Sequence, residues 1–165
     1  MYALKKLEYK TIIHEYNSAE ELSAGDRQLI QMAKEATAEA YAPYSNFYVG
    51  AALRLDNGTC VIGNNQENIA YPSGLCAERV AVFAASAQYP GIAFNTIAIT
   101  AKSNDFIVDN PVTPCGSCRQ VLAEYEHLYS KPIRIILCGA KGKVLVIDKV
   151  EDILPFSFRA DKLKK

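Results

Sequence analysis

Apolar residues recur every three to four positions along three segments of the chain, and this spacing predicts three helices. They cover residues 23–41, 76–88 and 115–129. Shorter runs rich in Val, Ile and Leu predict five strands, at residues 47–55, 59–63, 96–100, 133–138 and 144–147. Asp56-Asn57-Gly58 joins the first two strands and is a strong hairpin signal. Residues 1–18 lack a clear period and are expected to form an edge strand or an arm.

The order of these elements predicts an α/β fold. We expect a three-layer αβα sandwich, with a mixed sheet of about five strands and helices on both of its faces. The chain has 165 residues, half of them apolar, which is enough for one full core and too few for two. We expect residues 1–24 to be an N-terminal arm or extension and residues 25–165 to be a single catalytic domain.

Charge and hydropathy exclude several classes of partner. Eighteen basic residues balance eighteen acidic ones, so no overall field attracts a polyanion, and nucleic acid is not expected as a partner. The longest apolar runs are far short of the ~20 residues that a membrane helix needs, so no membrane partner is expected. The N-terminus lacks the apolar core of a secretory signal. With five cysteines, an odd number, we expect reduced thiols and a cytoplasmic location.

Three cysteines stand where two of the predicted helices begin. Thr113 is the predicted N-cap of the third helix and Pro114 its first residue, so Cys115 and Cys118 project from one face of the first turn. The positive end of the helix dipole stabilises thiolates there. With Cys76 they supply three sulfurs to one Zn²⁺. Three protein ligands leave the fourth tetrahedral position open for water, as in catalytic zinc sites.

A glutamate and two arginines accompany these cysteines. Glu78 is two residues from Cys76, close enough to move protons beside the metal without binding it. Three thiolates give the zinc site a net negative charge, so a cation is expected nearby. Arg79 and Arg119 each follow one of the two motifs, and either guanidinium can donate to the sulfurs. The sequence therefore predicts a hydrolytic zinc enzyme.

The cysteines admit other interpretations. The Cys115 and Cys118 pair alone has the spacing of a redox dithiol, but Cys76 and Glu78 favour zinc, because the zinc deaminase signature combines a ligand-x-Glu segment with Pro-Cys-x-x-Cys. A structural zinc site would need a fourth ligand. Cys60 and Cys138 lie on predicted strands and are expected to be core residues.

Five motifs together make the chain resemble the small, homotetrameric cytidine deaminases of pyrimidine salvage. The similarity runs from about Leu29 to Leu163. The motifs are Ala42-Pro43-Tyr44-Ser45-Asn46-Phe47-Tyr48-Val49-Gly50-Ala51-Ala52, Gly63-Asn64-Asn65-Gln66-Glu67-Asn68, Cys76-Ala77-Glu78-Arg79, Pro114-Cys115-Gly116-Ser117-Cys118-Arg119-Gln120 and Leu154-Pro155-Phe156-Ser157-Phe158.

The resemblance implies the substrate and its contacts. Cytidine or 2′-deoxycytidine is hydrolysed to the uridine nucleoside and ammonia, with one Zn²⁺ per subunit and with Glu78 carrying protons. The side chains of Asn65 and Glu67 correspond to a clamp on the sugar 3′-hydroxyl, and Phe47 to a ring beside the base or sugar. The resemblance also implies backbone contacts from the Ala77 N–H to the base O2 and from the Thr113 carbonyl to the C4 amino group. Phe158 corresponds to an aromatic residue lent to a neighbouring subunit of a homotetramer.

The chain also departs from the family pattern. The stretch before about Ala24 has no counterpart in the shortest members, and we expect this arm to pad a subunit contact. Phe156 is bulkier than the common small residue at its position, and the loop at residues 102–114 is longer than usual. Tyr71-Pro72-Ser73-Gly74-Leu75 replaces a Pro-free segment before Cys76.

Rival functions keep part of this chemistry. A deaminase of a modified cytosine nucleoside, such as an aminoacyl-nucleoside antibiotic, is the nearest alternative, although Asn65 and Glu67 favour plain nucleosides. A nucleic-acid editing deaminase usually carries His in place of Cys76 and needs a basic path for the strand, which zero net charge does not indicate. A non-catalytic zinc-binding protein would leave Glu78 without a role.

Overall fold

The computed structural model describes residues 4–159 and residue 163. The first three residues of the predicted arm, and residues 160–162 and 164–165 of the predicted domain, lie outside the described residues. The strands are β1 (His14–Tyr16), β2 (Phe47–Leu55), β3 (Cys60–Asn64), β4 (Phe94–Ser103), β5 (Arg134–Cys138) and β6 (Val144–Ile147). The helices are α1 (Ala24–Ala36), α2 (Ala77–Gln88) and α3 (Gly116–Leu128). The 3₁₀ turns are η1 (Ala19–Glu21), η2 (Thr37–Glu39), η3 (Tyr71–Ser73) and η4 (Val150–Ile153).

All six strands belong to one mixed sheet with the order β1-β6-β5-β4-β2-β3. Strands β4 and β5 are parallel, and the other neighbouring pairs are antiparallel. The predicted fold class is confirmed, with six strands instead of about five. The additional strand is β1, which pairs with β6 at the edge of the sheet. Residues 1–18 were expected to form an edge strand or an arm, and they form both, since only His14–Tyr16 pair with the sheet.

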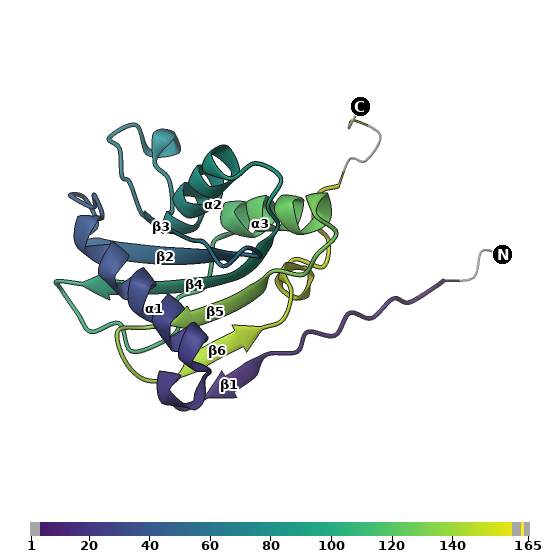
Figure 1. The fold of residues 1–165 in the computed structure, drawn as a ribbon, viewed down its shortest axis with the longest axis horizontal. Helices are drawn as coiled ribbons and strands as arrows, with labels where there is room; N and C mark the ends of the chain where they lie inside the picture. The colour runs from purple at the N-terminus through teal and green to yellow at the C-terminus, as the bar shows by residue number, and fades with distance from the viewer. Residues whose placement is uncertain (1–3, 160–162, 164–165) are drawn as a thin grey trace.

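The sheet lies between two layers of helices (Figure 1), and alternation along its central strands gives two core clusters. In β2, Ala51, Leu53 and Leu55 belong to the same buried cluster as residues of α2 and α3, whereas Ala52 belongs to the cluster of α1. Because successive side chains of a strand point to opposite faces, one apolar strand supports both helical layers. Helix α1 therefore covers one face, and α2 and α3 cover the other.

Helix α2 packs unusually close to β3. A Cβ atom added to Gly63 would lie 2.4 Å from the Ala81 backbone nitrogen and 2.5 Å from the Ala77 carbonyl oxygen. Only glycine leaves room for this approach. The first turn of α2, which follows Cys76, is thereby held directly against the sheet.

Two predicted helix ends need correction. Helix α1 ends at Ala36 and continues as the 3₁₀ turn η2 instead of reaching residue 41. The N-cap of α3 is Cys115, not Thr113, and Pro114 precedes the cap instead of opening the helix. Cys115 has extended backbone angles, φ −66° and ψ 168°, and its carbonyl accepts the first intrahelical bond from the Arg119 N–H at 3.0 Å. Cys118 remains in the first turn of the helix.

Within the described part of the chain, no helix has the length and apolar character that crossing a membrane requires.

Candidate active site

Three cysteine sulfurs meet where α2 and α3 begin. Cys76 is the N-cap of α2, Cys115 is the N-cap of α3, and Cys118 is buried in the first turn of α3. The Sγ atom of Cys115 lies 3.8 Å from that of Cys76 and 3.4 Å from that of Cys118. All three sulfurs lie within 4.8 Å of one another. Two helix N-termini thus direct their partial positive charge at one group of thiols.

This sulfur cluster fits a zinc ion. Tetrahedral zinc with bonds of about 2.3 Å to sulfur requires sulfurs about 3.8 Å apart, and the observed separations are close to that value. Among the residues that the structure describes, Cys76, Cys115 and Cys118 are the one group of three or more His, Cys, Asp or Glu side chains close enough to share a metal. The donor set is soft and supplies three ligands, which is typical of a catalytic zinc site with an open position.

The charge state of the cluster also suits a cation. Hydrogen bonding from Cys118, with further donation from Arg79 and Cys115, lowers the pKa of Cys76 to about 5 against the opposing effect of burial. The hydrogen bond to Cys76, together with burial, raises the pKa of Cys118. The cluster therefore carries a thiolate at neutral pH, as metal binding requires.

Arg79 is the cation beside these sulfurs. Its Nη2 lies 3.6 Å from the Cys76 Sγ and 3.4 Å from the Gly74 carbonyl oxygen. The bond to Cys76 raises the pKa of the guanidinium. Among the described side chains, Arg79 also has a buried Nε without a hydrogen-bond partner. A positive charge with a spare donor thus adjoins the thiols.

Arg119 is directed elsewhere. Its Nε donates to the Pro114 carbonyl at 2.9 Å and its Nη1 to the Ile153 carbonyl at 3.1 Å. Arg119 therefore supports the backbone on the N-terminal side of Cys115 and connects it with η4. Of the two arginines that the sequence suggested as partners of the thiols, Arg79 donates to a sulfur, whereas the bonds of Arg119 described above go to backbone carbonyls.

Glu78 lies in the first turn of α2 with only 4% of its surface exposed. Burial, together with the negative charge of Cys76, raises the pKa of its carboxyl. A carboxyl group with a raised pKa is suited to exchanging protons near neutral pH. Its position beside the thiol cluster places that exchange next to the candidate metal site.

A cavity of about 540 Å³ opens beside Cys76. The second motif of the sequence contributes Asn65 and Glu67 to its wall, and Cys76 and Arg79 lie in the same wall. The remaining wall residues are Tyr44, Ser45, Val49, Gln66, Asn68, Tyr71, Gly74 and Leu75. The fold therefore combines the predicted sugar-binding residues and part of the sulfur cluster in one cavity of a size suited to a small molecule.

Glu67 is oriented by the segment before β2. Its carboxylate accepts hydrogen bonds from the Tyr44 N–H at 2.9 Å, from the Ser45 N–H at 3.3 Å and from the Ser45 hydroxyl. Desolvation raises its pKa, but these bonds outweigh that effect and lower it. Glu67 is therefore ionised at neutral pH and is fixed before any ligand arrives.

Asn65 is held in a similar way by β2. Its Oδ1 accepts from the Val49 N–H at 2.7 Å, and its Nδ2 donates to the Phe47 carbonyl at 2.9 Å. One donor and one acceptor position of the amide remain beyond these two bonds. The residues that orient Glu67 and Asn65 were missed as site residues, although Tyr44 and Ser45 stand in the first of the quoted motifs.

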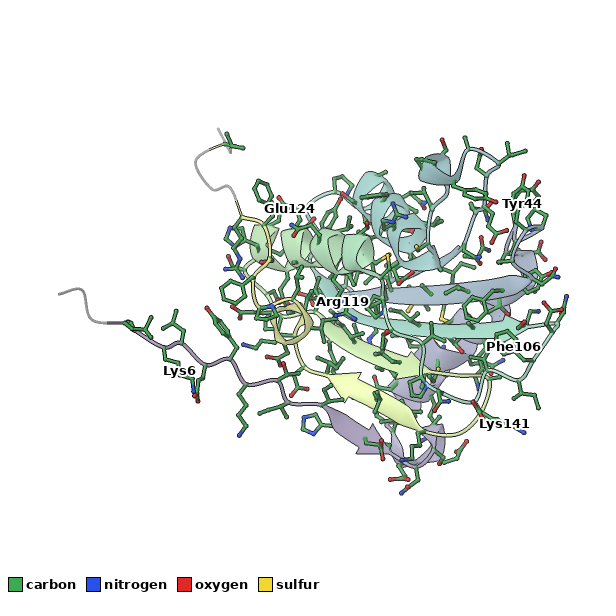
Figure 2. All side chains as sticks on the ribbon, turned by 180° about the vertical axis from the view of Figure 1, so that it is seen from behind. Lys6, Tyr44, Phe106, Arg119, Glu124 and Lys141 are labelled. Carbon is green, nitrogen blue, oxygen red and sulfur yellow. The ribbon has the colours of Figure 1, made fainter. Side chains whose placement is uncertain are left out.

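The other predicted site residues occupy different places. Phe47 stacks on Phe106 with ring centroids 6.2 Å apart. Ala77 is fully buried behind Cys76. Thr113 lines a second cavity, of about 370 Å³, together with Arg119. Phe158 is 72% exposed and is absent from the wall of the larger cavity. Figure 2 shows Arg119 near the middle of the molecule, away from the labelled Tyr44 at the cavity.

The three-layer fold, three convergent thiols and a buried glutamate define a zinc-binding deaminase domain. The family model described as "Cytidine and deoxycytidylate deaminase zinc-binding region" matches residues 23–129. The chain belongs to this family, and the resemblance noted from its motifs is confirmed.

Several members of known activity or structure are similar to the chain. The cytidine deaminase of Sporosarcina psychrophila is 39% identical over 137 residues, which are 82% of this chain and 93% of that protein. The cytidine deaminase of Halalkalibacterium halodurans is 39% identical over 84% of this chain and 98% of its own length. The crystal structure of cytidine deaminase from Burkholderia pseudomallei is 41% identical, with a TM-score of 0.69, over 79% of this chain and 97% of that one.

Proposed function

We propose that the protein hydrolyses cytidine and 2′-deoxycytidine to uridine and 2′-deoxyuridine with release of ammonia, as a cytoplasmic enzyme of pyrimidine salvage. The observation that carries this proposal is the cavity in which Glu67 and Asn65 share a wall with Cys76. Its substrate is supported by the cytidine deaminases that are 39% identical to the chain.

Cys76, Cys115 and Cys118 would hold one Zn²⁺ per subunit. When bound, this ion supplies Lewis acidity and lowers the pKa of a water molecule to the range where it becomes a nucleophile at neutral pH. Arg79 offsets the negative charge of the thiolates, because its guanidinium lies 3.6 Å from the Cys76 sulfur.

Glu78 is the proton carrier of the reaction. Its buried carboxylate accepts the proton that the attacking water loses and delivers it to N3 of the base. A second proton passes through the same carboxyl to the C4 amino group, which leaves as ammonia when its bond to C4 breaks. The overall balance is one nucleoside and one water in, and one uridine nucleoside and one ammonia out. Burial supports this role because it raises the pKa of Glu78.

The remaining residues orient the nucleoside. Glu67 and Asn65 bind the 3′-hydroxyl of the sugar, and Phe47 lies beside the base or sugar. The backbone N–H of Ala77 donates to O2 of the base, and the carbonyl of Thr113 accepts from the C4 amino group. A fixed carboxylate supports sugar binding, since Glu67 is already held by Ser45 and the Tyr44 N–H.

The active protein is a homotetramer in which Phe158 enters the nucleoside cavity of a neighbouring subunit. Two observations support this assignment. Phe158 is 72% exposed, and it does not line the larger cavity of its own chain. An exposed aromatic ring gains most by burial against another surface.

The direct test follows the ultraviolet absorbance of cytidine after addition of the zinc-loaded protein. We expect loss of cytidine with release of ammonia, and no turnover by Glu78→Gln or after treatment with a chelator. Glu39→Gln is a matched control, because Glu39 is an exposed acid on η2. If the intact zinc-loaded protein leaves cytidine unchanged, the proposed function is wrong.

The alternative substrate class, aminoacyl-nucleoside antibiotics, has weaker support. The blasticidin-S deaminase of Bacillus cereus is 27% identical over 140 residues, against 39% for the two cytidine deaminases. Measuring the turnover of blasticidin S in the same absorbance assay distinguishes the two substrate classes. Faster turnover of the antibiotic than of cytidine would favour the alternative.

A further inference from the structure

The segment that carries Phe158 is hydrogen-bonded to α3 on the side that faces the domain. Gln120 pairs with the backbone of Phe158 in both directions, with its Oε1 accepting from the N–H and its Nε2 donating to the carbonyl, each at 2.9 Å. Arg119 donates to the Ile153 carbonyl at 3.1 Å. These partners stand one and two residues after Cys118, so the position of Phe158 is tied to the helix that contributes two candidate zinc ligands.

The N-terminal arm lies on the outer side of the same segment. The ring of Tyr9 contacts the ring of Phe156 with centroids 4.7 Å apart and an interplanar angle of 58°. The hydroxyl of Thr11 donates to the Asp152 carbonyl at 2.7 Å. Figures 1 and 2 show the arm leaving β1 and projecting away from the sheet, and Figure 2 shows Lys6 on its outer part. The arm therefore contacts the chain on both sides of Pro155.

Consecutive residues of the arm lie against this segment, since Tyr9, Lys10 and Thr11 line a small cavity together with Asp152 and Pro155. Thr11 and Ile13 line the cavity of about 370 Å³ together with Ile153 and Pro155. The residues beyond Tyr9 behave differently. Lys6 pairs with Glu8 at 2.6 Å, and their side chains are 80% and 77% exposed. The arm therefore contacts this segment with residues between Tyr9 and Ile13 and is solvated at Lys6 and Glu8.

The hydrogen bonds between Gln120 and Phe158 are weak by themselves. Both bonds between Gln120 and Phe158 are exposed to solvent, where water competes for the same donors and acceptors. Holding the backbone in one conformation also costs conformational entropy. Contacts from the arm therefore add to those of Gln120 and Arg119 in holding the segment from Asp152 to Phe158.

We propose that the N-terminal arm is a positioning element for the nucleoside site, in which Tyr9 and Thr11 hold the segment of residues 152–158 so that Phe158 is presented to a neighbouring subunit. This proposal rests on the proposed function, since it assigns the place of Phe158 and not the chemistry. Tyr9 and Thr11 lie outside residues 23–129, which the family model matches, whereas Phe156 stands in the last of the five motifs. The arm's side of this contact therefore lies outside the matched region.

Steady-state kinetics with cytidine test the Tyr9 and Phe156 contact. Tyr9→Ala should raise KM about three- to tenfold, the range to which one aromatic pair corresponds. The value of kcat should stay within about twofold of the parent, because the arm does not touch Glu78 or the cysteines. Tyr9→Phe keeps the ring and should restore the KM of the parent. Glu8→Ala is the matched control, because Glu8 lies in the solvated outer part of the arm.

A double-mutant cycle distinguishes a shared contact from two independent effects. If the rings act as one unit, Tyr9→Ala combined with Phe156→Ala should raise KM no further than either single change. Hydrogen exchange gives a readout independent of turnover. The amides of Phe156, Ser157 and Phe158 should exchange faster in Tyr9→Ala than in Tyr9→Phe.

The outcomes separate this proposal from the proposed function. If the parent protein does not deaminate cytidine, the proposed function fails. If the parent is active and Tyr9→Ala has the KM and amide exchange of Glu8→Ala, the arm is not a positioning element. Additive effects in the cycle would also overturn the shared contact. Light scattering at assay concentration adds one more criterion, because it measures the oligomeric state. If Tyr9→Ala partly dissociates and the oligomer that remains has the KM of the parent, the arm stabilises the assembly and does not position Phe158.

Discussion

The Nη2 atom of Arg79 lies 3.6 Å from the Sγ atom of Cys76, and this contact distinguishes it from the other arginine of the site motifs. Arg119 donates instead to the carbonyls of Pro114 and Ile153. The two residues follow their motifs in the same way, yet one faces a sulfur and the other faces backbone oxygens. Of the two arginines, Arg79 is therefore the one whose positive charge adjoins the thiols.

Arg79→Gln should retain zinc but lower kcat for cytidine about ten- to a hundredfold, because the thiolates would lose the positive charge beside them. Turnover and zinc content measured on the same preparation check this. Arg119→Gln is the matched control and should affect turnover less than Arg79→Gln, since its partners are backbone carbonyls. Equal turnover of Arg79→Gln and the parent protein would reject the tuning role.

Replacement of any of Cys76, Cys115 and Cys118 by Ser should reduce bound zinc well below one ion per chain and abolish turnover. A hydroxyl is a poorer zinc ligand than a thiolate, and two remaining sulfurs do not complete the site. Elemental analysis of the purified variants measures the zinc content. Cys60→Ser should keep its zinc, because Cys60 is a half-buried residue of β3 outside the cluster. Full zinc in Cys118→Ser would contradict the ligand set.

Glu67→Gln should reduce discrimination between cytidine and 3′-deoxycytidine. A hydrogen bond to a charged group contributes about 1.5–3 kcal/mol, so the parent protein should prefer cytidine in kcat/KM by about ten- to a hundredfold. The variant should lose most of that preference. Asn68→Ala is a control in the wall of the same cavity and should keep the preference. An undiminished preference in Glu67→Gln would show that Glu67 does not bind the 3′-hydroxyl.

Asp26→Asn should lower the free energy of unfolding by about 2–3 kcal/mol at pH 7, between the values for exposed and for buried ion pairs. Asp26 is 6% exposed and bonds to Arg134 at 2.9 Å and to Arg54 at 3.2 Å. Denaturant unfolding of both proteins measures the difference. Asp56→Asn should cost less, because Asp56 and its partner Lys131 are more exposed.

The same pair of proteins has a predicted pH dependence. Desolvation raises the pKa of Asp26, but hydrogen bonds from Ser23 and the charge and hydrogen bonds of Arg134 and Arg54 outweigh it and lower the pKa below 3.8. The ionised carboxylate therefore contributes stability above that value, and this contribution is lost as the pH falls through the folded-state pKa. The difference in unfolding free energy between the parent and Asp26→Asn should narrow below pH 3.8. A constant difference would contradict this linkage.

Gly63→Ala should destabilise the protein by about 1–3 kcal/mol, the usual cost of overpacking, and should also lower turnover. Its Cβ would lie 2.4 Å from the Ala81 nitrogen, so α2 would have to move with Cys76 and Glu78. Thermal unfolding and cytidine turnover check both effects. Gly58→Ala is a useful comparison, because its positive φ of 85° strains the hairpin turn without an atom within 4 Å of the new Cβ. Loss of stability alone in Gly63→Ala would show that α2 adjusts without moving the site.

The sequence by itself determined the fold class and the cysteines of the cluster. The apolar periods defined the three helices and five of the strands, because period 3.6 and period 2 are properties of the local chain. Cys76, Cys115 and Cys118 were identifiable because their spacing places them at helix starts, and α2 and α3 do begin at Cys76 and Cys115. These features depend on neighbours in the sequence.

Only the tertiary structure decided what depends on distant parts of the chain. Arg119 donates to the Ile153 carbonyl of η4, a residue 34 positions further along the chain, and no local pattern encodes that contact. Its bond to the Pro114 carbonyl, which accompanies the shift of the α3 cap from Thr113 to Cys115, and the bond of Arg79 to Cys76 are by contrast local. The contact between Tyr9 and Phe156 joins the two ends of the chain. Such contacts arise from long-range packing, and a sequence pattern is local.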